Sequence, residues 1–302
     1  MSNSLSVGVI GLGAMGMGMA QSLRRAGHVV HVFDVRAEVA QKFAVEGGVA
    51  CASLADIAKA SDILVSVVVN AAQTESVLMG DGTASSGCIH HLKPGSVFVM
   101  CSTVDPAFSV GLEKTLHAKG LLYIDAPISG GAAKAASGQM TMMTAGTPQA
   151  YAKAEPFLNA MAAKVYKLGD SAGAGSKVKI INQLLAGVHI AAAAEAMALG
   201  LREGVAADAL YEVITNSAGN SWMFENRMAH VLAADYTPLS AVDIFVKDLG
   251  IVLDMARASK FPLPLSSTAH QMFMQASTAG HGREDDSAVI KIFPGIELPQ
   301  AH

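Results

Sequence analysis

The chain has 302 residues, which is enough for two domains that each bury a core of their own. Apolar residues make up 51% of the chain and charged residues only 15%, which excludes a disordered protein and favours further burial between subunits. The net charge is −4 and the sequence has no basic block, so nucleic acid is not expected as a partner.

The first predicted elements are a strand, a glycine-rich turn and a helix. Residues 7–10 form a short apolar run typical of a buried strand, and helical character begins at Met15. Between them, Gly11, Gly13 and Gly16 give the spacing G-x-G-x-x-G. The first glycine permits a sharp turn, the second lets a diphosphate approach the backbone, and the third allows the helix to pack closely on the strand. This turn predicts a dinucleotide site at the helix N-terminus, formed by Gly11, Leu12, Gly13, Ala14, Met15 and Gly16.

An acidic residue follows where a dinucleotide site needs one. Residues 28–33 alternate toward a second strand that ends in Asp34. A carboxylate there would accept hydrogen bonds from the adenosine ribose hydroxyls, which predicts NAD as the cofactor. The alternative is a glycine-rich helix start that only packs tightly, aided by Gly18 and Ala20. Because a strand, a helix and an acid all stand in the expected places, we favour the cofactor site.

Up to about residue 168, strand-like runs alternate with helical stretches, the pattern of an α/β Rossmann domain with a doubly wound, mostly parallel sheet. Residues 63–69 form a continuous β-branched run, as expected of a central strand, and residues 97–100 form another strand. Ligands bind at the carboxyl ends of parallel strands, where this chain has Val69, Asn70, Ser102 and Thr103. Polar residues at strand ends also cap turns without any ligand, and that alternative stays open for each of them.

A loop with two adjacent glycines follows the predicted strand 121–124. Its sequence is DAPISGG over residues 125–131. Ser129, Gly130 and Gly131 place a hydroxyl and exposed backbone N–H groups at a strand end, an arrangement that holds a carboxylate. The plainer interpretation is a tight turn in which glycine supplies a positive φ.

After Gly169 the sequence changes character. About thirty residues without proline follow a glycine turn at 173–175, and as one helix they would be on the order of 45 Å long and apolar nearly all round. Polar residues within this helix, among them Asn182 and Glu195, favour a buried helix over a membrane span. Further helices are expected over residues 208–215, 221–233, 240–259 and 265–279. The sequence thus predicts two domains, residues 1–170 and 171–302, of which the second is all-α and begins with this long interdomain helix.

Alcohol oxidation beside a dinucleotide needs a group that takes a proton, and lysine is one of the usual choices. Lys179 lies in the first turns of the long helix, and Asn182 and Gln183 follow three and four residues later on the same helix face. Lys177 lies on a roughly opposite face. Lys247 lies in an otherwise apolar helical stretch. The alternative for both Lys179 and Lys247 is that each extends to solvent, as most lysines do.

Four segments together resemble the signatures of the 3-hydroxyacid (β-hydroxyacid) dehydrogenase family, which includes 3-hydroxyisobutyrate dehydrogenase. The segments are GLGAMGMGMA (11–20), DAPISGG (125–131), GAGSKVKIINQ (173–183) and FVKDL (245–249). They occur in the family's order and cover nearly the whole chain. The resemblance implies an N-terminal Rossmann domain, an all-α C-terminal domain, and a homodimer or homotetramer.

The same resemblance implies roles for single residues. Lys179 matches the catalytic general base of the family, and Thr103 matches a residue at the nicotinamide end of the cofactor. Lys247 matches a residue near the closed cofactor site. The substrate loop is matched by Ser129, Gly130 and Gly131.

One position departs from the family pattern. Members usually carry Asn four residues after the catalytic lysine, whereas here Gln183 follows Asn182, and both are expected to bind substrate. With this departure and the segments 220–230 and 238–249, the chain is most similar to the branch of the family that oxidises L-threonate with NAD. That branch oxidises L-threonate at C2 and gives 2-dehydro-L-erythronate. The rival substrates are 3-hydroxyisobutyrate and tartronate semialdehyde. A non-catalytic relative that binds dinucleotide as an interaction module is disfavoured by Lys179.

The remaining expectations concern the compartment and the partners. Cys51, Cys88 and Cys101 share no metal-ligand spacing and no even disulfide framework, so no metal site and a reducing compartment are expected. The N-terminus lacks a basic region and a cleavage site. The sequence therefore predicts a cytoplasmic protein whose partners are a small hydroxy acid and further copies of itself, with no membrane partner.

Overall fold

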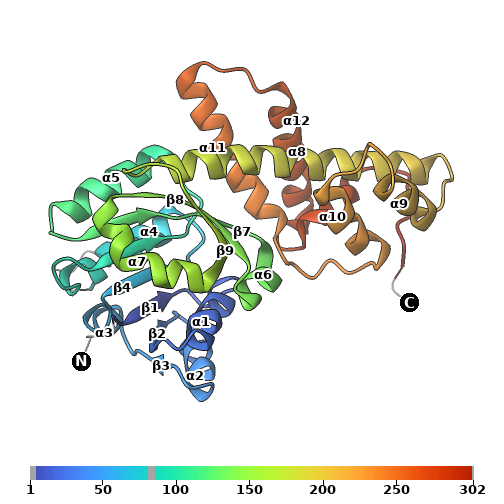
Figure 1. Ribbon diagram of the computed structural model, residues 1–302. Helices are drawn as coiled ribbons and strands as arrows, with labels where there is room; N and C mark the ends of the chain where they lie inside the picture. Colours follow the sequence, from blue (N-terminus) through green and yellow to red (C-terminus); the bar gives the residue numbers. More distant parts are fainter. Residues whose placement is uncertain (1–4, 81–85, 301–302) are drawn as a thin grey trace. The chain divides into compact units, whose positions relative to one another are not determined.

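The computed structural model describes residues 5–80 and 86–300. Contacts between residues divide the chain into two compact units, Met1–Lys179 and Ile180–His302. Helix α8 (Ala174–Arg202) begins in the first unit and continues in the second (Figure 1). Each unit is described by itself.

Among the described residues, the first unit contains one nine-stranded sheet in the order β3-β2-β1-β4-β5-β6-β8-β7, with β9 paired to β8. The strands from β3 to β6 are parallel, and β8 runs antiparallel to β6 and β7. The order reverses between β1 and β4, because β2 and β3 lie on one side of β1 and the later strands on the other. The strand bounds are β1 Val7–Ile10, β2 Val30–Phe33, β3 Val49–Ala50, β4 Ile63–Ser66, β5 Val97–Met100, β6 Leu122–Asp125, β7 Ile128–Ser129, β8 Met140–Gly146 and β9 Ala162–Lys167.

Helices cover both faces of this sheet, which is the doubly wound arrangement (Figure 1). Alternate strand residues enter different cores. Val97 and Val99 pack with residues of α1 and α7, whereas Phe98 and Met100 pack with residues of α4 and α5. Full burial of each such side chain stabilises the fold by about 1.5–3 kcal/mol. The helices of this unit are α1 Gly16–Arg25, α2 Ala37–Val45, α3 Leu54–Ala60, α4 Ala71–Met79, α5 Pro106–His117, α6 Gly131–Ser137 and α7 Pro148–Met161, with a short 3-10 helix at Cys88–His90.

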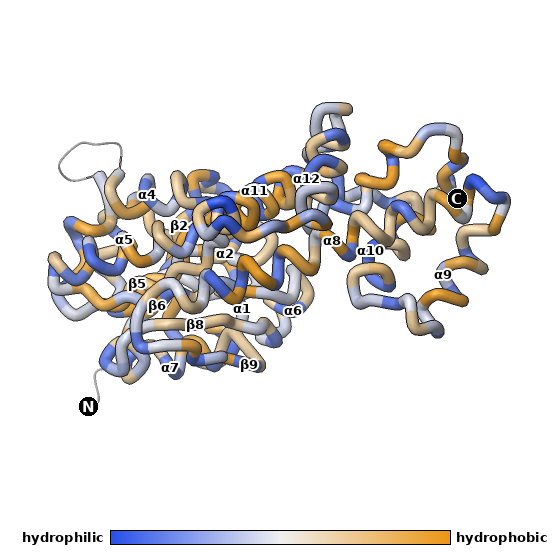
Figure 2. Tube along the Cα trace, turned by 90° about the horizontal axis from the view of Figure 1, so that it is seen from above, coloured by the Kyte–Doolittle hydropathy of each residue, from blue (hydrophilic) through white to orange (hydrophobic). Residues whose placement is uncertain are grey.

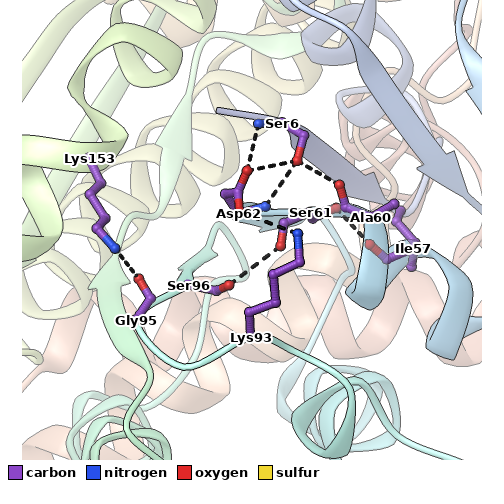
Figure 3. A network of polar contacts seen from close by, with 9 residues as sticks. All are labelled: Ser6, Ile57, Ala60, Ser61, Asp62, Lys93, Gly95, Ser96 and Lys153. Carbon is purple, nitrogen blue, oxygen red and sulfur yellow. Dashed lines mark hydrogen bonds and ion pairs between the residues drawn. The ribbon is translucent and has the colours of Figure 1, made fainter. Parts of the chain in front are cut away.

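Polar contacts join the amino ends of β1, β4 and β5 (Figure 3). The N–H of Ser6 donates to Oδ2 of Asp62 at 3.0 Å, and Nζ of Lys93 lies 3.5 Å from Oδ1 of the same carboxylate. The hydroxyl of Ser96 donates to the carbonyl of Ser61 at 3.4 Å. These contacts lie at the amino ends of the strands, opposite the carboxyl ends where ligands bind to parallel sheets.

In the described part of the second unit, all regular structure is helical. Its core combines one side of α8, including Ile190 and Met197, with apolar residues of the later helices such as Phe245 and Phe273. The two rings of Phe245 and Phe273 stack with centroids 5.1 Å apart. The later helices are α9 Ala207–Thr215, α10 Trp222–Leu232, α11 Val242–Ser259 and α12 Pro264–Ala276, followed by short helical turns at Ser277–His281 and Asp286–Ile292.

Helix α8 has the length and apolarity that a membrane span would need. The mean hydropathy of its most apolar window is 1.7, and Figure 2 colours the helix by hydropathy. Within the protein, 44% of that window is buried. The buried residues belong to the helical core, which explains the apolar character of that side of the helix. Ile181, Leu185 and Leu199 lie on the helix with half or more of their surface exposed.

Candidate functional site

The turn after β1 is built by its glycines. Gly11 has a φ of +88°, and a Cβ there would lie 2.8 Å from the carbonyl oxygen of Val67. A Cβ on Gly16 would lie 1.8 Å from the carbonyl oxygen of Gly11. Gly13 is exposed, and no atom lies within 4 Å of where its Cβ would be. The turn therefore needs Gly11 and Gly16 for its own packing, and Gly13 leaves open space where a ligand can approach the backbone.

Asp34, directly after β2, is bonded to this turn. Its Oδ2 accepts from the N–H of Leu12 at 2.7 Å, and its Oδ1 accepts from the N–H and Nε of Arg36 at 2.9 and 3.2 Å. Burial alone would raise the pKa of Asp34, but the hydrogen bonds from Arg36 and Leu12 outweigh burial and lower it. Asp34 is therefore an ionised acceptor at neutral pH.

A pocket of about 320 Å³ lies beside Asp34, where the strand order reverses. Four predicted cofactor residues line it, namely Gly11, Gly13, Asp34 and Val69. The sequence interpretation did not include Gln73 and Ser76 of α4, which also line the pocket. Gln73 accepts at its Oε1 from the N–H of Val69 at 2.8 Å. The open backbone at Gly13 and the carboxylate of Asp34 fit the diphosphate and a ribose of a dinucleotide, respectively.

The other predicted cofactor residues of the first unit have diverse surroundings. Leu12 is buried in the core, whereas Ala14 is exposed and Met15 is half-buried. Asn70 is the N-cap of α4 and its Oδ1 accepts from the N–H of Gln73 at 2.8 Å, so capping explains its residue type by itself. Thr103 is half-buried in the loop after β5.

Ser102, next to Thr103, links the segments that follow strands β4 and β5. Its hydroxyl donates to the carbonyl of Val68 at 2.7 Å and lies 3.0 Å from the hydroxyl of Thr74. The side chain is buried, so its residue type has a structural explanation.

The predicted substrate loop leads from β6 through β7 to α6. Ser129 is half-buried and pairs with Thr141 of β8. Gly130 and Gly131 have φ values of +140° and +75°, which favour glycine at both positions. The tight turn is therefore present in the structure, and its backbone angles by themselves explain both glycines.

The start of α8 depends on two further glycines. Gly173 has a φ of +101°, and a Cβ on Gly175 would lie 2.4 Å from the carbonyl oxygen of Met143. The first turn of α8 therefore packs directly on the backbone of β8. Lys179, one turn further, is only 7% exposed, whereas Lys177 is exposed. Lys179 thus does not extend freely into solvent.

In the second unit, the predicted site residues Asn182 and Gln183 contact each other, and a third, Lys247, is linked to them through Asp248. Asn182 donates to Oε1 of Gln183 at 3.1 Å. Gln183 donates to Oδ2 of Asp248 at 2.6 Å, and Nζ of Lys247 lies 2.7 Å from Oδ1 of that carboxylate. Asp248 was not singled out from the sequence, although its place after Lys247 was visible. Over residues 5–80 and 86–300, no group of three or more His, Cys, Asp or Glu residues is arranged to hold a metal.

Two family models together match almost the whole chain. Residues 6–169 match the NAD-binding domain of 6-phosphogluconate dehydrogenase. Residues 173–293 match a model described as the NAD-binding domain of NADP-dependent 3-hydroxyisobutyrate dehydrogenase.

Similar proteins have been named and solved. An L-threonate dehydrogenase of Cupriavidus necator is 67% identical, covering 98% of this chain and 98% of that protein. An L-threonate dehydrogenase of Escherichia coli K12 is 53% identical, covering 98% and 97%. A crystal structure described as 3-hydroxyisobutyrate dehydrogenase of Salmonella typhimurium is 53% identical, covers 96% of this chain and 100% of that chain, and superposes with a TM-score of 0.91.

Proposed function

Because this chain belongs to the 3-hydroxyisobutyrate dehydrogenase-type family of NAD-dependent hydroxy-acid oxidoreductases, we propose that it oxidises L-threonate at C2 to 2-dehydro-L-erythronate. The full-length identity of 67% to an L-threonate dehydrogenase carries this proposal. The presence of Gln183 where the family usually has Asn supports it further.

The first unit would hold the cofactor through its glycine turn. The N–H groups of residues 11–16 and the N-terminus of α1 favour the diphosphate, and Asp34 accepts hydrogen bonds from ribose hydroxyls. Bound NAD supplies the acceptor for a hydride. Further proposed cofactor residues are Val69 and Asn70, which follow β4, and Thr103, which follows β5. The family resemblance adds Lys247 to them.

Lys179 is the proposed general base. As hydride leaves C2 of the substrate, the unprotonated amine of Lys179 takes the hydroxyl proton, so one C–H and one O–H bond break and a C=O bond forms. The backbone N–H groups of Gly130 and Gly131, with the hydroxyl of Ser129, hold the substrate carboxylate. Asn182 supplies an amide group that meets a remaining hydroxyl. Gln183, which the sequence also assigned to the substrate, has its amide engaged by Asn182 and Asp248.

A second candidate function is oxidation of 3-hydroxyisobutyrate. The solved relative with a TM-score of 0.91 bears that description, which favours this alternative. Tartronate semialdehyde reduction would use the same groups in the opposite direction. A non-catalytic dinucleotide-binding module does not account for a buried Lys179.

The protein is proposed to act as a homodimer or homotetramer in the cytoplasm, with residues 1–170 as the NAD-binding domain and 171–302 as the substrate and oligomerisation domain. Ile181, Leu185 and Leu199 are 53%, 51% and 62% exposed along α8, and a second copy of the chain would cover them. Light scattering of wild type and of Leu199→Glu tests the proposed oligomer. A monomeric wild type would contradict the proposal.

The proposed reaction is tested by incubating the protein with L-threonate and NAD. We expect NADH to form, and we expect carbon-13 NMR to show a ketone at C2. Formation of a product oxidised at C3, or turnover of 3-hydroxyisobutyrate but not of L-threonate, would contradict the proposal.

A further inference from the structure

An ion pair and two hydrogen bonds connect four side chains of the second unit in a series that ends at Asn182. The ammonium of Lys247 pairs with one oxygen of Asp248 at 2.7 Å. The other oxygen of Asp248 accepts from the amide nitrogen of Gln183 at 2.6 Å, and the amide oxygen of Gln183 accepts from Asn182 at 3.1 Å. Asp248 is 1% exposed and Gln183 is 8% exposed, so water competes little for these bonds.

The carboxylate determines the direction of each bond in the series. Because the oxygen of Asp248 is the acceptor, Gln183 turns its NH₂ group toward Asp248 and its carbonyl oxygen toward Asn182. Asn182 must then use its own NH₂ group. The reverse orientation would place the amide oxygen of Gln183 against the carboxylate oxygen of Asp248, so that two buried acceptors would face each other. A buried polar group that loses its hydrogen-bond partner lowers the stability of the fold by about 1–3 kcal/mol.

The length of Gln183 is essential to this arrangement. An asparagine at position 183 would be shorter by one carbon–carbon bond, about 1.5 Å. Because the bond to Asp248 is 2.6 Å long, that withdrawal would carry the amide beyond hydrogen-bond distance. The departure from the usual Asn therefore has a specific partner, Asp248.

We propose that Asp248 and Gln183 are positioning residues that orient Asn182, so that its Oδ1 accepts a hydrogen bond from a second hydroxyl of a polyhydroxylated acid. Asn182 is half-buried, and because its Nδ2 is turned to Gln183, its Oδ1 is the group that the series presents as an acceptor. An acceptor fixed in this way favours a ligand that donates and disfavours an analogue without the hydroxyl. This inference rests on the proposed function, because it concerns how the same site selects its substrate.

The first test moves one methylene group from one side of the hydrogen bond between Gln183 and Asp248 to the other. Selectivity is measured as the ratio of kcat/KM for L-threonate to kcat/KM for its 3-deoxy and 4-deoxy analogues, since one of the two lacks the selected hydroxyl. We expect Gln183→Asn and Asp248→Glu each to lower one ratio about tenfold or more. The double variant, in which the total length is restored, should recover at least part of that loss. Asp254→Asn on the same helix, where Asp254 is exposed and paired with Arg257, is the matched control.

The split between kinetic constants separates positioning from general damage. The single variants should raise KM for L-threonate and leave the affinity for NAD within a few-fold of wild type. Equal loss for L-threonate and both deoxy analogues, or no recovery in the double variant, would overturn the proposal.

A second test requires neither turnover nor L-threonate. Side-chain amide resonances of Gln183 in the wild-type protein, assigned with Gln183→Leu, should show slow hydrogen exchange and a downfield proton typical of a bond to a carboxylate. Solvent-like amide signals would overturn the positioning role. If the protein instead turns over another hydroxy acid, the proposed function fails, while these resonances still decide the orientation of Gln183.

Discussion

The hydroxyl of Ser176 donates to Oδ1 of Asp125 at 2.7 Å, so the first turn of α8 is held at the carboxyl end of β6. The other carboxylate oxygen accepts from the N–H groups of Gly173 and Ser176, each at 2.9 Å. A single buried side chain thus satisfies two N–H groups at the start of the helix that carries Lys179. Burial raises the pKa of Asp125, although these hydrogen bonds oppose the shift.

Asp125→Ala should destabilise the first unit and lower kcat together. The N–H groups of Gly173 and Ser176 would lose their acceptor, which costs about 2–4 kcal/mol in the free energy of unfolding. Thermal unfolding and kcat with NAD measure both effects. Asp170→Ala, on an exposed residue of the preceding loop, is the control. An unchanged Tm would show that the hydrogen bonds of Asp125 do not contribute to the stability of the fold.

Lys179→Ala should lower kcat by roughly 10²–10⁴, which is the usual contribution of a positioned proton acceptor. NAD affinity should change little, because the pocket beside Asp34 lies elsewhere in the unit. Lys177→Ala, an exposed lysine two residues away, should retain wild-type kcat. Retention of more than about a tenth of kcat in folded Lys179→Ala would assign the base to another residue.

Wild type should prefer NAD over NADP in kcat/KM, because the ionised Asp34 would repel a 2′-phosphate. Asp34→Ser should reduce that preference by removing the negative charge and leaving Arg36 without its partner at 3.2 Å. Arg36→Ala should increase the preference for NAD. Equal or better wild-type activity with NADP would refute the role of Asp34.

The stability of the first unit should depend on the ionisation of Asp62. Partial burial would raise the pKa of this carboxyl, but the hydrogen bonds from Ser6 and the Lys93 ammonium outweigh burial and lower it. A lowered pKa in the folded state contributes stability that is present above the unfolded pKa of 3.8 and is lost as pH falls through the folded pKa.

Asp62→Asn should therefore lower Tm at pH 7, and the difference from wild type should shrink as pH falls below 3.8. Thermal scans across this range measure it, with Asp170→Asn as the control. A difference in Tm that is constant with pH would show that the charge of Asp62 is not involved.

Sequence patterns predicted the elements whose signal is local. The helix expected at residues 208–215 is α9, and the run of about thirty residues is α8. The strand expected at 63–69 ends instead at Ser66, because the chain beyond it turns to line the pocket with Val67 and Val68. The two-residue strand β7 is too short to leave a periodic pattern.

The side-chain partners of the site residues could not be predicted in this way. Gln183 and Asp248 are 65 residues apart, and Ser176 and Asp125 are 51 apart, so no local pattern joins either pair. The sequence showed that Gln183 departs from the family pattern, but only the fold showed that Asp248 is its hydrogen-bond partner. Gln73 likewise lines the pocket beside Asp34 because α4 begins near Val69.

The most direct test of the account is the ratio of kcat/KM for L-threonate to that for 3-hydroxyisobutyrate, measured with NAD on the wild-type protein. A site whose polar groups are oriented for a second hydroxyl rejects an acid that lacks it, because those groups are then left unpaired. We predict a ratio of about 100 or more in favour of L-threonate. A ratio below one would contradict the account.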